Sequence, residues 1–144
     1  MTENLGRIPV RRRDGHELFS DGEQKLEFDL LDFWQWSASD LVSNTMRGVL
    51  AEYVVARALG IDVTGGARDG WAACDLCTPS GVKVEVKSAA YLQSWHQSKR
   101  STVCFRTPPT RAWDPDTGCF DPAAKRQADV YVFALLAHEE KSTL

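Results

Sequence analysis

One short run of the sequence carries residues that could bind a metal ion. Glu85 and Lys87 stand two positions apart in the run Gly81–Ser88, and Asp75 precedes the glutamate by ten positions. Carboxylate oxygens are ligands for hard cations such as Mg²⁺. The residue types and their spacing therefore favour a site for a hard cation.

The residues around this run predict a β-hairpin. Valines alternate with charged residues along Val82–Ser88, as in a strand with one buried face, so Glu85 and Lys87 share the polar face. The segment Ala73–Thr78 precedes this strand, and the turn-forming residues Pro79–Gly81 separate the two. The chain is therefore expected to fold back on itself here and to bring Ala73–Thr78 beside the charged strand.

The three-residue loop and the apolar pattern together predict a register. Leu76 pairs with Val84 on the apolar face, which sets Asp75 opposite Glu85 on the other face. Two carboxylates directly opposed across strands destabilise the pairing unless a cation lies between them. This register predicts an Mg²⁺ site, with Mn²⁺ as the alternative ion. An edge strand whose charged face only meets water is the competing interpretation.

A third carboxylate lies on a predicted helix. Residues 40–59 have helical periodicity, with Ser39 or Asp40 as N-cap and Gly60 as the end. Within that helix Glu52 has only glycine, valine and alanine at three and four positions on either side. A carboxylate in such a setting needs a cation or a donor from elsewhere, or its pKa rises. Glu52 is therefore a third candidate site residue. The alternative is that it only lies over the core near the helix end.

These residues resemble the PD-(D/E)XK nuclease superfamily, which has the restriction-endonuclease-like fold, and within it the Mrr-type and Holliday-junction-resolvase-like branches. The resemblance covers roughly residues 40–87. It implies an α/β core in the order helix, three strands, helix, strand, with a mixed central β-sheet and Ile61–Thr64 as its first strand. Cys74 stands where the superfamily usually has a proline before its aspartate.

The resemblance also implies an activity and its residues. Glu52, Asp75, Glu85 and Lys87 match the helix acid, the aspartate of the second strand and the acid-any-lysine of the third. The implied enzyme is an Mg²⁺-dependent deoxyribonuclease, an endonuclease of restriction, repair or recombination type. Asp75, Glu85 and the carbonyl of Val86 would hold the metal, and Glu52 a second ion or the attacking water. Lys87 would orient or deprotonate that water.

Length and composition limit the possible domain organisation. The 144 residues, 43% of them hydrophobic, suit one nuclease-like domain over residues 26–144 behind a flexible basic arm over residues 1–25. The N-terminus lacks the apolar core of a signal peptide, and no apolar run is long enough to span a membrane, which predicts a cytoplasmic protein. Its four cysteines are then reduced thiols, and a single CxxC does not favour structural zinc.

The charge distribution bears on the expected partner, DNA. A net charge of −3 gives no global attraction to a polyanion, so local basic groups would have to make the contacts. Candidates for DNA binding are Arg47, Ser88, Lys99 and Arg100. A catalytically inactive DNA-binding or scaffold module on the same fold is one alternative, and a protein-interaction domain is another. A homodimer is compatible with the sequence.

The remaining segments predict further elements. Leu26–Trp36 is dense in apolar residues and is expected to cover the first helix or to form an interface, and 102–106 reads as a strand. The proline-rich stretch 107–122 reads as a substrate-facing loop, 123–128 as a helical turn and 130–137 as a buried strand. Because relatives of the implied kind continue beyond this strand, the chain is either a short member or truncated at its C-terminus.

Overall fold

The centre of the molecule is a three-stranded sheet with the order β3–β4–β7. The computed structural model describes residues 5–144. β3 (Leu76–Cys77) pairs antiparallel with β4 (Lys83–Ala90), and β4 pairs in parallel with β7 (Val130–Leu136). The sheet is therefore mixed, as predicted, and the last predicted strand is confirmed to within one residue at its end. The expectation that this strand is buried is wrong, since Val130, Phe133 and Leu135 are exposed.

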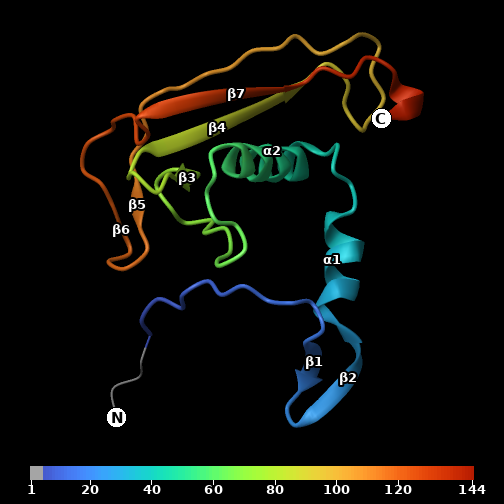
Figure 1. Cartoon of the computed structure of the whole chain (residues 1–144), viewed down its shortest axis with the longest axis vertical. Coiled ribbons are helices and arrows are strands. Elements are labelled where there is room, and N and C mark those ends of the chain that lie inside the picture. Colours follow the sequence, from blue (N-terminus) through green and yellow to red (C-terminus); the bar gives the residue numbers. More distant parts are fainter. Residues whose placement is uncertain (1–4) are drawn as a thin grey trace.

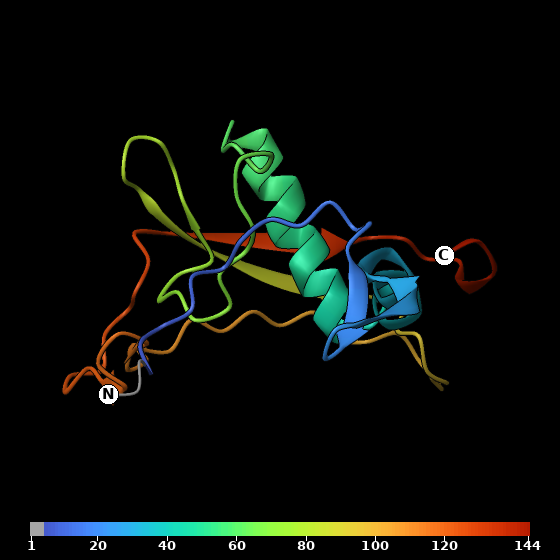
Figure 2. The same cartoon turned by 90° about the horizontal axis from the view of Figure 1, so that it is seen from below.

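Helix α2 (Asn44–Ala58) covers one face of this sheet, as Figures 1 and 2 show from two directions. The best buried apolar residues come from α2 and β4, and they are Ala56, Val84, Val86, Ala90 and the nearby Leu92. The alternating valines thus face the helix, because every second side chain of a strand points to the same side. The α/β class with a mixed central sheet is confirmed.

The predicted helix begins later than expected and ends where expected. Ser43, in place of Ser39 or Asp40, is the N-cap, and its hydroxyl accepts from the amide of Met46. Gly60 follows the helix with a φ of 69°, a left-handed conformation that glycine adopts without steric cost.

The hairpin register is as predicted for the residues that pair, but Asp75 lies outside the ladder and is not the expected strand partner of Glu85. Leu76 pairs with Val84, and the Thr78 amide donates to the Val82 carbonyl at 2.9 Å. Gly81 closes the turn at a φ of 85°. β3 is shorter than expected, however, because the backbone ladder stops after Leu76 and the side chain of Asp75 takes over as the partner of β4.

Three expected elements of the core are absent from these described segments. Residues 61–64 form a turn, because the Asp62 carboxylate accepts from the amides of Thr64 and Gly65. Residues 102–106 run extended along the side of the sheet opposite α2, without strand pairing (Figure 1). Residues 123–128 are irregular, since the backbone of Lys125 pairs with Thr110 in a β-bridge. The order helix, three strands, helix, strand is therefore not reproduced in full.

Two small hairpins complete the described chain. β1 (Leu18–Asp21) and β2 (Gln24–Asp29) lead into α1 (Leu30–Ala38), and β5 (Trp113–Asp114) pairs with β6 (Cys119–Phe120) inside the predicted proline-rich loop. A short 3₁₀ turn, η1 (Lys141–Thr143), lies near the C-terminus. Neither helix among the described residues has the length and apolarity that a membrane crossing needs.

The N-terminal hairpin and α1 lie apart from the sheet and α2 (Figure 1). Asp29 caps α1 reciprocally with Asp32, which fixes the start of the helix. Every residue of α1 keeps exposed surface, so the expectation that 26–36 covers the first helix is wrong. The boundary predicted at residue 25 falls inside β2, and residues 1–4 of the predicted arm lie outside the described part.

Candidate active site

Asp75 links β3 to β4 through its side chain. Its Oδ2 accepts a hydrogen bond of 2.7 Å from the backbone amide of Val86, between Glu85 and Lys87. Burial raises the pKa of Asp75, and the charges of Glu85 and Glu52 raise it further, against the lowering effects of this bond and of Lys87. Asp75 is thus a partly buried carboxylate whose negative charge lacks full compensation.

Glu85 and Lys87 lie side by side on the face of β4 that points away from α2. The Lys87 Nζ contacts Glu85 Oε1 at 2.5 Å. Burial lowers the pKa of Lys87, but its hydrogen bond to Glu85 and the charges of Glu85 and Asp75 outweigh this effect, so the net shift is upward. Lys87 is therefore a stable cation near neutral pH, suited to donating hydrogen bonds and poorly suited to removing a proton from water.

The candidate residues line two separate hollows. One, of about 320 Å³, lies between α2 and the loop 61–77 and contains Glu52 and Asp75. The other, of about 120 Å³, contains Glu85 and Lys87, with Arg106, Gln127 and Tyr131 among its lining. Asp75 stands between them, since it lines the first hollow and interacts electrostatically with both Glu85 and Lys87.

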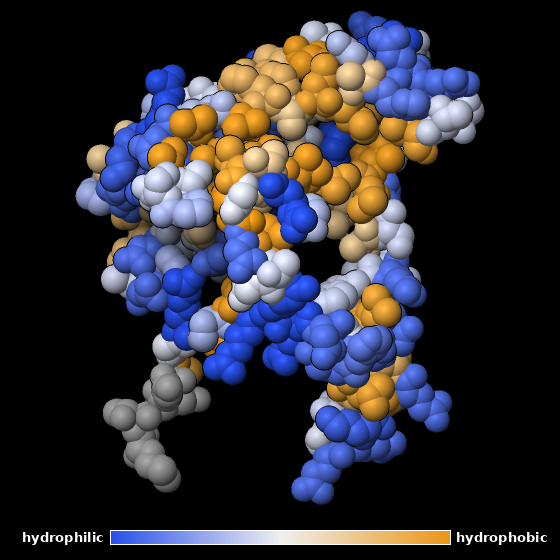
Figure 3. Space-filling model, viewed as in Figure 1, coloured by the Kyte–Doolittle hydropathy of each residue, from blue (hydrophilic) through white to orange (hydrophobic). Residues whose placement is uncertain are grey.

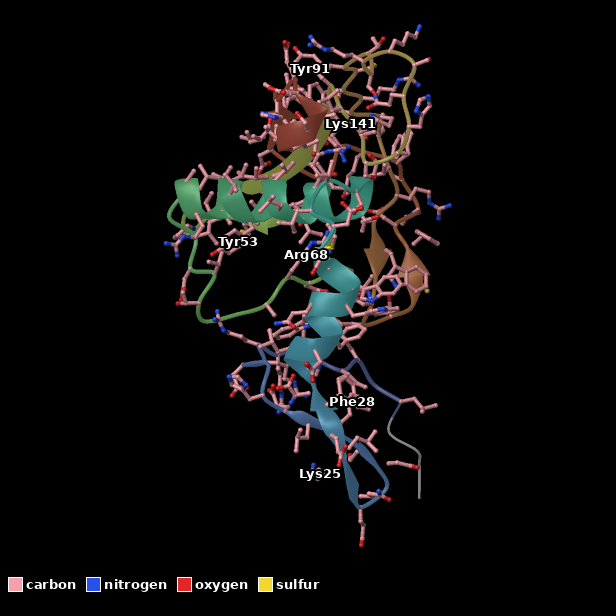
Figure 4. All side chains as sticks on the ribbon, turned by 90° about the vertical axis from the view of Figure 1, so that its right-hand side faces the viewer. Lys25, Phe28, Tyr53, Arg68, Tyr91 and Lys141 are labelled. Atoms are coloured by element: carbon pink, nitrogen blue, oxygen red, sulfur yellow. The ribbon has the colours of Figure 1, made fainter. Side chains whose placement is uncertain are left out.

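Glu52 has a partner that the sequence did not indicate. Only 8% of the residue is exposed, and both carboxylate oxygens accept from the guanidinium of Arg68, at 2.5 and 2.9 Å. Figure 4 places Arg68 and Tyr53 on the side of α2 that faces away from β7. Arg68 lies in a glycine-rich loop without periodicity, so no sequence pattern could connect it with Glu52.

The carboxylates of the two hollows are the groups available to bind a divalent cation. Among the described residues, no three acidic, histidine or cysteine side chains gather closely enough to hold a metal ion. Asp75 and Glu85 remain as a pair of acids in mutual electrostatic contact, and oxygen donors of this type suit Mg²⁺. The set fits an ion held by two carboxylates with backbone oxygen and water, and it does not support Glu52 as a third ligand.

Arg47, predicted to contact DNA, is a buried residue. Its guanidinium donates to the Val42 carbonyl at 2.9 Å, to Asn44 at 2.6 Å and to Gln93 at 3.1 Å. A further bond of 3.3 Å reaches the hydroxyl of Ser88, another predicted DNA contact. This network ties the start of α2 to the end of β4. A role of Arg47 and Ser88 in DNA binding stays a prediction, and their burial and bonding weigh against it.

Lys99 and Arg100 lie in the exposed loop that follows β4. Arg100 forms an ion pair of 3.0 Å with Glu139, so part of its charge is compensated. Gln97 bonds to the Lys99 carbonyl and to Ser101, which gives the loop a defined shape. Both basic residues are accessible to a phosphate backbone, and their contact with DNA stays a prediction.

The fold defines an α/β protein with a mixed sheet, and its two acids and lysine are groups that could serve phosphodiester cleavage. Residues 28–144 match the sequence model of the bacteriophage T4 endonuclease IV family. The chain belongs to this family, and it is accordingly an endonuclease. No curated protein and no solved structure matches it. Membership of the PD-(D/E)XK superfamily stays a prediction.

Proposed function

We propose that the chain is a metal-dependent endonuclease that hydrolyses phosphodiester bonds of DNA around Asp75, Glu85 and Lys87. The observation that carries the proposal is the position of Asp75, bonded to the Val86 amide and electrostatically coupled to Glu85 and Lys87. The proposed site thus combines an acid from the segment before β3 with an acid and a lysine from β4. The family match supplies the class of reaction.

Asp75 and Glu85, with the carbonyl of Val86, are the groups that would hold Mg²⁺ or Mn²⁺. When bound, such an ion supplies an activated water and stabilises negative charge on the phosphate. The raised pKa of Asp75 supports this assignment, because a carboxylate that is partly buried and also lies near other acids gains from a cation.

Lys87 acts as a charged donor. Because its pKa is raised, it is protonated when the substrate arrives and can donate to a phosphate oxygen or to the attacking water. Arg106 shares the hollow of Lys87 and brings a second positive charge from the neighbouring extended segment. We assign to this pair the binding of the phosphate group, and to Gln127 and Tyr131 the remaining hydrogen bonds of the hollow.

Glu52 acts through Arg68 in this proposal. Their ion pair lies in the other hollow and holds the loop 61–77 against α2. Since this loop leads directly into Asp75, the pair positions the aspartate and does not touch the reacting phosphate. The chain's repair, restriction or recombination setting belongs to the same proposal and rests on the resemblance alone.

A cleavage assay tests the site. Supercoiled, linear and branched DNA are incubated with the full chain in Mg²⁺ or Mn²⁺, and the rates are compared with those of Lys87→Ala. Loss of one such donor lowers a cleavage rate by about 10²-fold or more. Lys83→Ala is the matched control, because Lys83 lies on the same face of β4, outside both hollows.

The expected result is a slow Lys87→Ala variant, a wild-type rate for Lys83→Ala, and loss of all cleavage in chelator that is restored by added Mg²⁺. Equal rates for Lys87→Ala and wild type contradict the role of the lysine. Cleavage that persists in chelator contradicts the metal. DNA binding without cleavage under every condition identifies the inactive module.

A further inference from the structure

The hairpin–helix module, defined as residues 18–38, exposes an unusual amount of apolar surface. Its large exposed apolar residues are Leu18, Phe19, Phe28, Leu31, Phe33, Trp34 and Trp36. Phe19 contacts Phe28 and Phe33, so part of this set forms a small cluster, but Trp36 remains 85% exposed. Large apolar residues left exposed on so short a segment are typical of an interaction site.

The module packs on itself more than on the rest of the chain. β1 packs on β2 and β2 on α1, whereas the extensive contacts of the sheet are with α2. The space-filling view shows an opening between the module and the part that carries α2 and the sheet (Figure 3). Residues 39–144, called the body below, therefore leave the apolar side of the module uncovered.

The total exposed area of the chain is larger than that of a compact monomer, which favours a binding partner. The chain exposes 10974 Å², whereas a compact monomer of 16.1 kDa exposes about 7,400 Å². The excess is larger than the roughly 1,000–2,500 Å² that each subunit buries in an obligate dimer. The chain therefore has enough surplus surface to form a dimer interface of that size.

Charge decides between a polyanion and a protein as the partner. The module contains five acids, Asp21, Glu23, Glu27, Asp29 and Asp32, against the single Lys25, which gives −4. The whole chain carries −3, of which residues 1–17 contribute +1 and the body 0, with twelve basic and twelve acidic residues. The module therefore repels DNA and another module alike, whereas a body without net charge does not repel it.

We propose that the module packs against the body of a second copy of this chain, so that two copies exchange modules in a symmetric dimer. The exchange brings an acidic, apolar surface onto a body without net charge, which buries the apolar residues without repulsion between like charges. In a twofold arrangement each copy gives and receives one module, so the assembly closes at two chains. This inference is independent of the catalytic assignment.

Sedimentation equilibrium of the full chain tests the proposal. Wild type is expected at twice the mass of one chain and to dissociate on dilution. Trp36→Asp, which places a charge on the exposed face of α1, should raise the dimer dissociation constant by about 30-fold or more, as the loss of a central aromatic anchor does. Trp36→Gln removes the ring without adding charge and is expected to act in the same direction.

Trp95→Asp is the control, because Trp95 is also an exposed tryptophan, 52% accessible, and lies in the body's loop after β4. It should leave the mass unchanged. Circular dichroism of each variant verifies that the monomer remains folded. A wild type that is monomeric at the highest concentration overturns the proposal, as does a Trp36→Asp variant with the wild-type dissociation constant. A monomer that loses DNA binding on Trp36→Asp would assign the module to DNA.

Discussion

At the scale of single residues, Asp75 has the most consequential position. Its carboxylate accepts from the Val86 amide where the β3–β4 ladder ends, and its charge interacts with those of Glu85 and Lys87. Strand periodicity predicted that an acid would stand near Glu85. It could not predict that this acid bonds to the Val86 amide, because the length of β3 depends on the tertiary structure.

Asp75→Asn is expected to abolish cleavage and to stabilise the fold in metal-free buffer at pH 7. Burial, and then Glu85 and Glu52, raise the pKa of Asp75, so the folded chain binds this proton more tightly than the unfolded chain does. Wild-type stability therefore falls as the pH rises from the ordinary value of 3.8 through the raised one, and it stays lower above. Asparagine keeps an acceptor for the Val86 amide and removes the charge.

Urea unfolding in chelator checks this expectation at pH 7 and at about pH 3, where the carboxyl is protonated in both states. The advantage of Asp75→Asn should be present at pH 7 and absent at the lower pH. Glu23→Gln, which removes an exposed acid far from the site, should show no such advantage. A variant that is less stable than wild type at pH 7 argues against an uncompensated charge at Asp75.

At the scale of elements, the sequence predicted best where one apolar pattern decided the outcome. The alternating valines of β4 and the continuous apolar run of β7 gave the correct strands, and Gly60 the correct helix end. The strand expected at 61–64 came from a resemblance, and a local turn around Asp62 prevents it. Arg68 and Arg106 were missed as site residues because isolated arginines in loops carry no periodic signal.

The Arg47 network is expected to stabilise the junction between α2 and β4. Arg47→Met keeps the length of the side chain but leaves the acceptors of Val42, Asn44, Ser88 and Gln93 without their donor. Buried acceptors without donors cost about 1–3 kcal/mol each at most, so a total loss of a few kcal/mol is expected. Urea unfolding measures it.

Arg57→Met on the same helix is the control, since Arg57 is exposed and should tolerate methionine within about 0.5 kcal/mol. The comparison also separates a structural role of Arg47 from a role in DNA binding. If Arg47→Met and Arg57→Met are equally stable while DNA binding falls only in the former, Arg47 serves the substrate and the structural assignment is wrong.

At the scale of the whole molecule, the two proposals concern different surfaces. The acids and the lysine lie in the hairpin region of the body, whereas the aromatic residues of the proposed dimer contact lie on the module around α1. Sequence patterns identified Leu26–Trp36 as apolar and allowed either core or interface. Composition alone could not choose between these, because the choice depends on how far α1 stands from α2, which only the tertiary arrangement shows.

The connectivity of the sheet has a consequence for the order of folding. The β3–β4 hairpin closes through the three residues Pro79–Gly81, whereas Val84 must find Val130 across the long irregular connection that contains β5 and β6. Short loops close at a lower entropic cost, so the hairpin should form first and β7 should dock later. Pulse-labelled hydrogen exchange during refolding should then show the Val86 amide protected before the amides of β7, and simultaneous protection would exclude this order. The carboxylates of Asp75 and Glu85 would accordingly be neighbours before β7 has docked. A cation bound between them could then promote folding of the rest of the sheet.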